Sequence, residues 1–360
     1  MKALIHENVA LAPLTTFRIG GPARYFADAL TEDAVLEAIH FAKDKDLPVF
    51  ILGGGSNLLI ADTGFPGLVI KVGIRGLDWY PEKDRMRVSA GAGEDWDCLV
   101  AAAVERDLAG IECLSGIPGS VGGTPVQNVG AYGQEVSEVL QSVRAYDRQI
   151  GSIVELSRED CRFTYRSSVF NTAAKNRYIV LSVTYSLINR GALAIRYPDV
   201  KHEFEGSTSP PTLSEVRDAV CRIRARKAML LVDGDSDCCS AGSFFKNPVI
   251  TETQFGDLQR RAASNVPRYP ASDGHVKTAA AWLIEQAGFS KGYSMGSAGL
   301  STKHTLALVN RGGARADDIL RLAREIRSRV RDRFGVVLAP EPVLLGFPDD
   351  VRAEFDLQGT

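Results

Sequence analysis

The stretch SGIPGSVGGTPVQNVGAYG, residues 115–133, holds six glycines, two prolines and no charged residue. A dense glycine cluster indicates backbone with positive φ, or backbone that approaches a ligand closely. Uncharged polar side chains are spaced through it, at Ser120, Gln127, Asn128 and Tyr132. Backbone N–H groups among small residues suit phosphate oxygens. The stretch therefore favours a loop that holds a pyrophosphate or a flavin ring edge, with a tight connection between core strands as the alternative.

A second glycine loop follows a short apolar run. Residues 49–52 predict a buried strand, and the chain then passes into Gly53-Gly-Gly-Ser-Asn57. Together with an amphipathic helix predicted over 31–47, this forms a β-α-β unit with its glycine loop after a strand, the usual place for a nucleotide. It is not the G-x-G-x-x-G fingerprint, because Leu58 stands where the third glycine would be. We therefore expect a dinucleotide bound in another way.

Composition is that of an ordinary globular protein. The 360 residues are 45% hydrophobic and 24% charged, with a net charge of −2 and a pI near 6.3. This predicts two or three domains with a large core, and it does not indicate nucleic acid or a membrane surface as a partner. The sequence shows neither an apolar run of ~18 residues nor a signal-peptide pattern, so we expect a cytoplasmic protein. The six cysteines contain no C-x-x-C, so we expect neither a metal site nor a disulfide framework.

Periodicity outlines the remaining elements. Further helices are predicted over 94–107, 212–227, from Thr251 onward, 276–287 and 315–334. Further strands are predicted at 58–60, 68–71, 85–90, 139–146, 153–156, 178–187, 305–310 and 336–345. The seven arginines of 315–334 favour a solvated, ion-paired face, and we expect the linker 228–240 to be exposed.

Three residues are candidates for chemistry, and each has a structural alternative. Glu341, between two prolines in an apolar run, is either a paired buried carboxylate or an edge-strand side chain in water. Ser243 lacks the G-x-S-x-G pattern of a hydrolase nucleophile, so it is either a functional hydroxyl or a strand-start serine. Arg166, beside Tyr165, is either a buried guanidinium at a site or part of an interdomain ion pair. Taken singly, these residues decide nothing.

Seven motifs taken together are similar to those of one enzyme family. They are TFRIGG (16–21), LGGGSN (52–57), GIPGSVGG (116–123), VQNVGAYG (126–133), FTYRSS (163–168), GSFFKNP (242–248) and APE (339–341). In this order the chain resembles the UDP-N-acetylenolpyruvoylglucosamine reductase, or MurB, family. The similarity runs from about residue 10 to 347 and so covers nearly the whole chain. Seven ordered motifs are far more specific than any one glycine loop.

The resemblance implies an α+β fold class. An FAD-binding fold of the vanillyl-alcohol-oxidase (PCMH) type would be followed by a smaller α/β substrate-binding domain. The implied boundaries are 1–72 for a first FAD-binding subdomain, 73–225 for a second one joined by the C-terminal strand 336–360, and 226–335 for the substrate domain. Non-covalent FAD is expected, because no histidine or cysteine lies in the glycine loops.

The resemblance also implies an activity. NADPH would reduce FAD, and the enolpyruvyl ether of UDP-N-acetylglucosamine would then be reduced to UDP-N-acetylmuramate for peptidoglycan precursors. Hydride would reach C3 of the enolpyruvyl group and a proton would reach C2. Arg166 and Glu341 match the residues to which the family assigns stabilisation of the enolate, and Ser243 matches its proton donor.

The binding residues that it implies fall into two sets. The cofactor set is Gly53, Gly54, Gly55, Ser56, Asn57, Pro118, Gly119, Ser120, Gly122, Gly123 and Asn128. The substrate set is Tyr132, Tyr197, Lys227, Asn247, Lys291 and His304. Tyr197 resembles the tyrosine loop of the longer family subtype. We expect no metal, no nucleic acid or membrane partner, and a monomer.

Two other functions remain as alternatives. The first is an FAD-dependent oxidase or dehydrogenase of the same fold, which gives no reason for Arg166, Ser243 and Glu341 to occur together. The second is a catalytically inactive nucleotide-binding protein, against which the intact polar set argues. A bound yellow cofactor would distinguish this second alternative from either enzyme.

Overall fold

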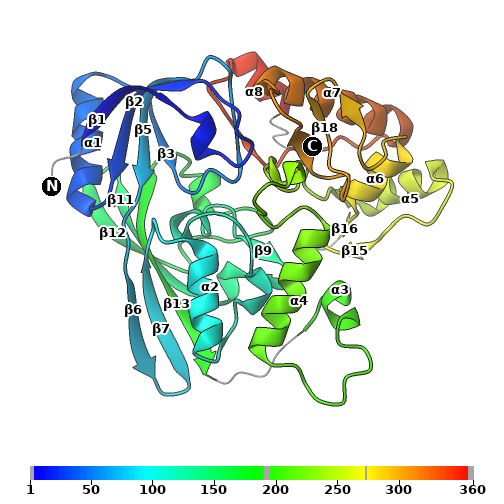
Figure 1. Ribbon diagram of the computed structural model, residues 1–360, viewed down its shortest axis with the longest axis horizontal. Helices are drawn as coiled ribbons and strands as arrows, with labels where there is room; N and C mark the ends of the chain where they lie inside the picture. The colour runs from blue at the N-terminus through cyan, green and yellow to red at the C-terminus, as the bar shows by residue number, and fades with distance from the viewer. Residues whose placement is uncertain (1–3, 190–194, 272–273, 356–360) are drawn as a thin grey trace. The chain divides into compact units, whose positions relative to one another are not determined.

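The chain forms two compact units, which the computed structural model describes over residues 4–189, 195–271 and 274–355. Unit 1 contains Met1–Val9, Ala23–Gly55 and Pro66–Arg226. Unit 2 contains Ala10–Pro22, Ser56–Phe65 and Lys227–Thr360. Each unit is therefore built from three separate segments of the sequence (Figure 1).

The first sheet of unit 1 contains the predicted β-α-β unit. Its order is β1 (Ile5–Ala10), β2 (Pro22–Ala29), β5 (Phe65–Val72) and β3 (Val49–Leu52), and β3 pairs with β5 in parallel. Helix α1 (Glu32–Asp44) begins after Thr31, whose hydroxyl accepts the Ala34 N–H at 3.1 Å. The glycine loop at Gly53 leaves the carboxyl end of β3, which confirms the predicted order of strand and loop.

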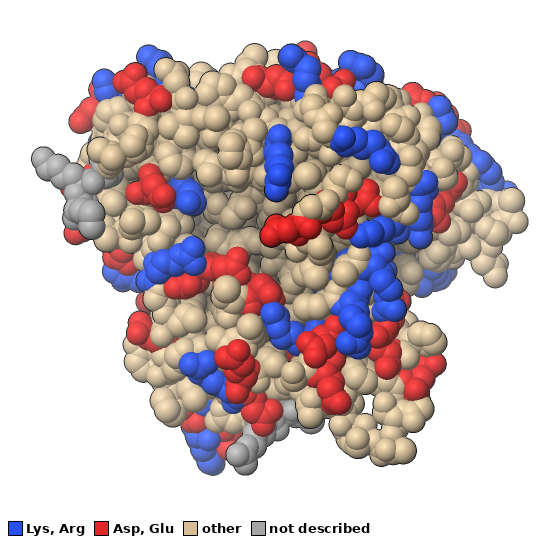
Figure 2. Space-filling model, in the orientation of Figure 1, with Lys and Arg blue, Asp and Glu red and all other residues tan. Residues whose placement is uncertain are grey.

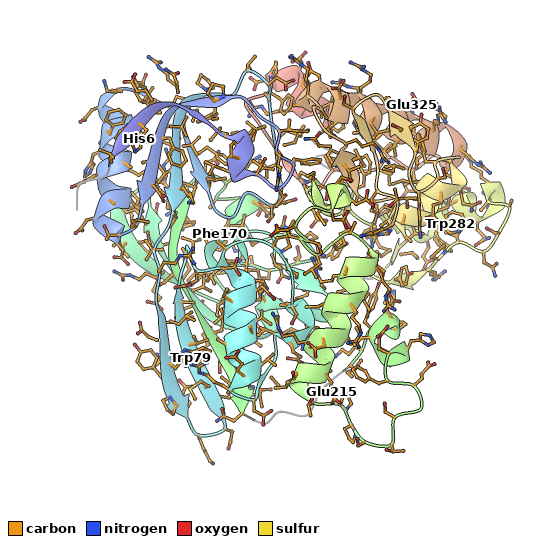
Figure 3. All side chains as sticks on the ribbon, in the orientation of Figure 1. His6, Trp79, Phe170, Glu215, Trp282 and Glu325 are labelled. Atoms are coloured by element: carbon orange, nitrogen blue, oxygen red, sulfur yellow. The ribbon has the colours of Figure 1, made fainter. Side chains whose placement is uncertain are left out.

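The second sheet of unit 1 is antiparallel, as the alternation predicts. Its order is β12 (Ser152–Ser157), β11 (Leu140–Asp147), β13 (Tyr178–Asn189), β7 (Arg85–Gly91) and β6 (Leu77–Glu82), and β8 (Leu108–Ala109) pairs with β13. Helix α2 (Trp96–Glu105) packs on it, with the Trp96 ring 5.8 Å from that of Tyr185 on β13. Trp79, labelled in Figure 3, lies on the outer strand β6. The Arg106 guanidinium lies over its ring, 4.6 Å from the ring centroid.

Short elements complete unit 1 around the glycine-rich stretch. They are η2 (Glu112–Leu114), η3 (Val121–Gly123), β9 (Gly130–Ala131), β10 (Gln134–Glu135), η4 (Val136–Glu138), η5 (Val169–Asn171), α3 (Pro198–His202) and α4 (Leu213–Arg226). The predicted capping box opens α4, because Glu215 N–H donates to Thr212 Oγ1 and Thr212 N–H donates to Glu215 Oε2.

Unit 2 contains helix α7 (Ala316–Phe334), whose apolar face belongs to the second core and which is closed by Gly335 at φ 72°. The other elements are η1 (Ala12–Leu14), β4 (Leu58–Ile60), η6 (Ser236–Cys238), β14 (Val249–Thr251), α5 (Glu252–Arg261), β15 (Tyr269–Pro270), β16 (His275–Lys277), α6 (Ala280–Gln286), β17 (Ser294–Met295), β18 (Ala298–Leu300), β19 (Leu308–Asn310), β20 (Val343–Leu345) and α8 (Asp349–Phe355). The ring of Trp282 on α6 lies 5.8 Å from that of Phe334 on α7 (Figure 3).

Strands of unit 2 far apart in the sequence pair with one another. Strand β20 runs parallel to β4, with Leu344 opposite Leu59. The ring of Phe17 packs edge-on against Phe244 at 6.4 Å, and both rings are fully buried. The second core is therefore completed by residues from the first 65 positions of the chain.

Three sequence-based predictions need correction. The helix predicted over 276–287 is strand β16 followed by α6, since Val276 pairs with Ile250. The strand predicted over 336–345 is reduced to β20. The linker 228–240 is not uniformly exposed, because Asp237, Cys238 and Ser240 are buried.

The C-terminal residues also group differently from the predicted domains. The resemblance implies that residues 336–360 join the FAD-binding part, whereas the structure groups them with 227–335 in unit 2. The reason is that β20 pairs with β4, and Phe347 and Phe355 belong to the second core. The three-part domain division itself stays a prediction.

Surface charge is mixed. On the face shown in Figure 2, acidic and basic side chains are interspersed. The arginines of α7 form the predicted ion pairs, among them Arg324–Glu354 and Arg329–Glu325. All six cysteines are free thiols. Among the residues described, no helix has the length and apolar character needed to cross a membrane.

Candidate active site

The two predicted glycine loops meet in unit 1. A methyl group on Gly54 would lie 2.6 Å from the Cα of Gly119, and one on Gly53 would lie 2.6 Å from Ser120 Oγ. Real side chains do not approach so closely, so glycine is required for the two backbones to touch. The N–H groups of Gly53, Gly54 and Ser120 donate no hydrogen bond to other described residues. This pair of loops forms a cradle of backbone donors.

The second loop is held in place from behind by α2 and the segment before it. Trp96 N–H donates to Gly119 O at 3.1 Å, and Gly122 N–H donates to Ala92 O at 2.8 Å. A methyl group on Gly122 would lie 2.7 Å from the Ala92 Cβ. The remaining donors are uncharged and closely spaced, which suits the oxygens of a pyrophosphate. The residues present therefore fit the dinucleotide FAD, with Gly55, Pro118 and Gly123 in the same loops.

Arg166 lies in a tight turn of unit 1. Thr164 and Ser167 exchange backbone hydrogen bonds of 3.0 and 3.1 Å, and Arg166 between them has φ 54°. Its Nη2 donates to the Gly130 carbonyl at 2.7 Å. This contact fixes the guanidinium against the short hairpin of β9 and β10.

Asn128 and the two tyrosines lie on either side of that hairpin contact in the sequence. Asn128 is buried and its side-chain amide bonds to protein groups, so a contact with FAD would use its backbone. The rings of Tyr132 and Tyr197 meet edge-on at 5.4 Å. Burial lowers the pKa of the Arg224 guanidinium, which interacts with the Tyr132 hydroxyl. The prediction missed Arg224, because helix α4 gives no local sign of what its residues face.

In unit 2, Ser243 and Glu341 lie on paired segments. Glu341 N–H donates to the carbonyl of Phe244 at 2.8 Å, and Phe245 pairs with Pro340. Asn57 completes the arrangement, because its Nδ2 donates to the Glu341 carbonyl at 3.2 Å and its own carbonyl accepts the Val343 N–H at 3.0 Å. The Ser56–Asn57 end of the first glycine motif therefore belongs to unit 2 and supports Glu341.

Three predicted substrate residues of unit 2 form one electrostatic group. Burial is the main cause that lowers the pKa of His304 to about 4, and the charges of Lys227 and Lys291 lower it further. The ring is therefore neutral near pH 7, and both ammonium groups act on it electrostatically. Asn247 is tied to helix α6, because its Oδ1 accepts the Ala280 N–H at 3.0 Å. Its amide nitrogen is thereby given a fixed direction.

The linker before Ser243 braces the turn that carries His304. The Asp237 carboxylate accepts Thr302 N–H at 3.0 Å and the Thr302 hydroxyl at 2.6 Å. Lys303 pairs with Asp235 at 2.5 Å. The prediction missed these residues, since partners 65 and 68 positions apart leave no local pattern.

Comparison with known proteins agrees with the site. Residues 235–345 match the family model described as "UDP-N-acetylenolpyruvoylglucosamine reductase, C-terminal domain", and 23–157 match "FAD binding domain". The UDP-N-acetylenolpyruvoylglucosamine reductase of Streptomyces coelicolor is 48% identical, covering 94% of this chain and 90% of its own. That of Thermobifida fusca is 45% identical, covering 94% and 98%.

A solved structure extends the comparison to the fold. The MurB of Thermus caldophilus is similar with a TM-score of 0.65 and 27% identity, over 96% of this chain and 99% of its own. The resemblance, the fold class and FAD as the cofactor are thereby confirmed. The chain belongs to the UDP-N-acetylenolpyruvoylglucosamine reductase family and is an FAD-dependent oxidoreductase.

Proposed function

We propose that this chain uses NADPH and FAD to reduce the enolpyruvyl ether of UDP-N-acetylglucosamine to UDP-N-acetylmuramate, a peptidoglycan precursor. The observation that carries the proposal is the pairing of the Ser243 and Glu341 segments, in which Glu341 N–H donates to Phe244 O. It places a hydroxyl and a carboxylate from residues 98 positions apart on two segments that hydrogen-bond to each other. An FAD oxidase of the same fold gives no reason for that pair. A cytoplasmic location and a monomeric state stay predictions.

FAD held by this chain would supply hydride chemistry, with NADPH as its reductant and C3 of the enolpyruvyl group as the acceptor. Residues of the glycine cradle would hold its pyrophosphate by backbone N–H groups, chiefly Gly53, Gly54 and Ser120. Closely packed glycines leave no side chain between the backbone and the phosphate oxygens.

Arg166 acts where negative charge develops. As C3 accepts hydride, carbanion character at C2 spreads into the substrate carboxylate. A guanidinium that is already held in place, here by Gly130 O at 2.7 Å, stabilises that charge without reorganising. One such donor typically contributes about 3–4 kcal/mol to lowering the barrier.

Ser243 supplies the proton. Its Oγ–H donates to C2, forming the C–H bond and leaving an alkoxide that is reprotonated from solvent or a neighbouring donor. A hydroxyl is a weak acid, but an enolate carbon is basic enough when the two are held in contact. Glu341, anchored through Asn57 and Phe244, orients this end of the substrate.

The cationic group of unit 2 suits the diphosphate of the substrate. Lys227 and Lys291 supply two positive charges, and His304, which interacts with both, is a neutral donor. Asn247 adds an amide with a fixed direction. Tyr132 and Tyr197 offer aromatic faces for the sugar or base.

Anaerobic half-reactions test the proposal. NADPH should bleach the flavin band of the purified protein, and UDP-N-acetylglucosamine enolpyruvate alone should restore it. Bleaching without recovery would leave a flavoprotein with another substrate and contradict the proposal. A simple alcohol or sugar that bleaches the flavin would support the oxidase alternative.

A further inference from the structure

The buried side chain of Asn128 hydrogen-bonds to the turn that carries Arg166. Asn128 is 1% exposed and its Nδ2 donates to two acceptors, the Thr164 carbonyl at 3.1 Å and Glu135 Oε2 at 2.7 Å. Its Oδ1 accepts the Ser137 N–H at 3.2 Å. Both amide hydrogens are therefore engaged by protein groups, one at the turn and one at the β9–β10 hairpin.

Thr164 is the first residue of that turn. Its carbonyl accepts both Asn128 Nδ2 and the Ser167 N–H, the bond that closes the turn around Arg166. The head group of Arg166 donates to Gly130 O, two residues after Asn128. The turn is thus bonded to residues 128–130 at two points, through the Thr164 carbonyl and through the Arg166 guanidinium.

The backbone at both ends of this link is left-handed. Asn128 has φ 46° and Arg166 has φ 54°, a region that L-residues other than asparagine and aspartate seldom occupy. A left-handed arginine persists only where its surroundings hold it there. Two side-chain amides outside the turn bond to its backbone: Asn171 Nδ2 donates to the Arg166 carbonyl at 3.2 Å, and buried Asn128 donates to the Thr164 carbonyl. Asn128 alone of the two also bonds to the β9–β10 hairpin, against which the guanidinium is held.

We propose that Asn128 is a positioning residue for Arg166, rather than a ligand of the cofactor through its side chain. By holding the Thr164 carbonyl it keeps the turn closed and the guanidinium directed, so it acts on the step in which charge develops on the substrate. This inference rests on the proposed role of Arg166.

A swapped pair separates the two bonds of the amide. In Asn128→Asp/Glu135→Gln, the new amide at 135 donates to the new carboxylate at 128, which restores the hairpin bond with donor and acceptor exchanged. The bond to the Thr164 carbonyl is not restored, because an oxygen now faces an oxygen. Asn176→Asp makes the first of the two changes, asparagine to aspartate in a left-handed backbone, at an exposed residue of unit 1 with φ 65°, and is the control for that change.

Two readouts are measured on the FAD-loaded protein. Hydrogen exchange in the peptide 163–168 should rise at least five-fold in the swapped pair, with 116–123 unchanged. Reoxidation by the UDP-sugar should slow by about ten- to a hundred-fold, while FAD content and reduction by NADPH stay within two-fold of the control. Unchanged exchange in 163–168, or a loss of FAD in proportion to activity, would overturn the inference.

A double-mutant cycle distinguishes positioning from a general structural role. In an Arg166→Ala background, the swapped pair should slow reoxidation less than two-fold further, because the group that it positions is gone. Fully additive losses would overturn the inference. If the swapped pair does not fold, Asn128→Gly, which tolerates the left-handed backbone, carries the same expectations. Wild-type protein that the UDP-sugar cannot reoxidise would sink the proposed function, while exchange at 163–168 would still test Asn128.

Discussion

Backbone conformation marks several of the predicted site residues. Asn128, Tyr132 and Arg166 have φ of 46°, 49° and 54°, although none is glycine. Each such conformation costs roughly 1–2 kcal/mol for an ordinary side chain. Sequence motifs singled out all three residues but could not show these conformations, because the contacts around them, such as the bond of Asn128 to the Thr164 carbonyl, join residues 36 positions apart.

Ser243 is predicted to matter in only one half of the reaction. Ser243→Ala should leave flavin reduction by NADPH within two-fold of wild type, since no proton from this hydroxyl is needed there. Reoxidation by the UDP-sugar should slow by ~10²–10⁴-fold, the usual contribution of a positioned proton donor. Stopped-flow absorbance resolves the two steps.

The matched control for this change is Ser264→Ala, at an exposed serine of unit 2. It should alter neither step. Equal slowing of both half-reactions in Ser243→Ala would argue for damage to the cofactor site and against proton donation.

The lowered pKa of His304 predicts that the free energy of unfolding of the chain depends on pH. Its pKa is about 4 in the folded chain, against 6.5 for a free histidine. As pH falls, the unfolded chain therefore takes up the proton first, and folding is disfavoured between pH 6.5 and about 4. Relative to His304→Gln, the free energy of unfolding of wild type should drop by roughly 1–3 kcal/mol between pH 7.5 and 4.5. Urea unfolding at both pH values measures this, and a difference independent of pH would contradict it.

At the scale of elements, the glycine loops were predictable and the linker was not. The short-range signals of strand, glycine run and capping box placed β3, α1 and α4 correctly. The linker 228–240 lacks such signals, since its buried Asp237 bonds to Thr302 and its Asp235 pairs with Lys303, both distant in the sequence. The same cause reduced the strand predicted over 336–345 to the three residues that find a partner in β4.

Gly54→Ala should abolish FAD binding. The added methyl would lie 2.6 Å from the Gly119 Cα, a backbone atom that cannot move aside without opening the cradle. We expect flavin absorbance per protein after gel filtration to fall by at least ten-fold. Gly256→Ala, in α5 with its nearest neighbour 3.8 Å away at the end of a flexible arginine, is the control and should keep full FAD. Full FAD in both variants would show that the two loops are not rigid.

Asp237→Asn tests the bracing of the His304 turn. The change leaves an amide facing the Thr302 N–H and hydroxyl and should weaken the two bonds at 3.0 and 2.6 Å. We expect affinity for the UDP-sugar, measured by titration of flavin fluorescence, to fall by about three- to thirty-fold with FAD content unchanged. Asp233→Asn, at an exposed position of the same linker, should have no effect. Equal affinities in the two variants would refute a role for the brace.

At the scale of the molecule, family motifs predicted the fold class, whereas the grouping of segments required the structure. The segment Ala10–Pro22 and the segment Ser56–Phe65 belong to unit 2, although both precede most of unit 1 in sequence. Their apolar residues look like any buried strand or loop, and pattern alone does not say which core receives them. Phe17 against Phe244 is one such assignment.

The segment Lys227–Thr360 should therefore not fold by itself. Without Ser56–Phe65, strand β20 has no parallel partner, and without Ala10–Pro22 the Phe244 ring loses Phe17. We expect the excised fragment to show no cooperative thermal transition by circular dichroism, under conditions where the full chain does. A sharp transition in the fragment would mean that its core is sufficient without those two segments.

The pairing of β4 with β20 also has a consequence for folding during synthesis, because β4 is made long before its partner. Asn57 and Glu341, which hydrogen-bond beside these strands, are 284 positions apart. A ribosome that adds ~5–20 residues per second needs roughly 15–60 s to cover that interval. During this time the apolar edge of Leu58–Ile60 exists without its partner, in a nascent chain long enough to find a wrong one. The chain should therefore need chaperones mainly during synthesis, in the interval between the appearance of β4 and that of β20. This need should end when β20 emerges and pairs with β4.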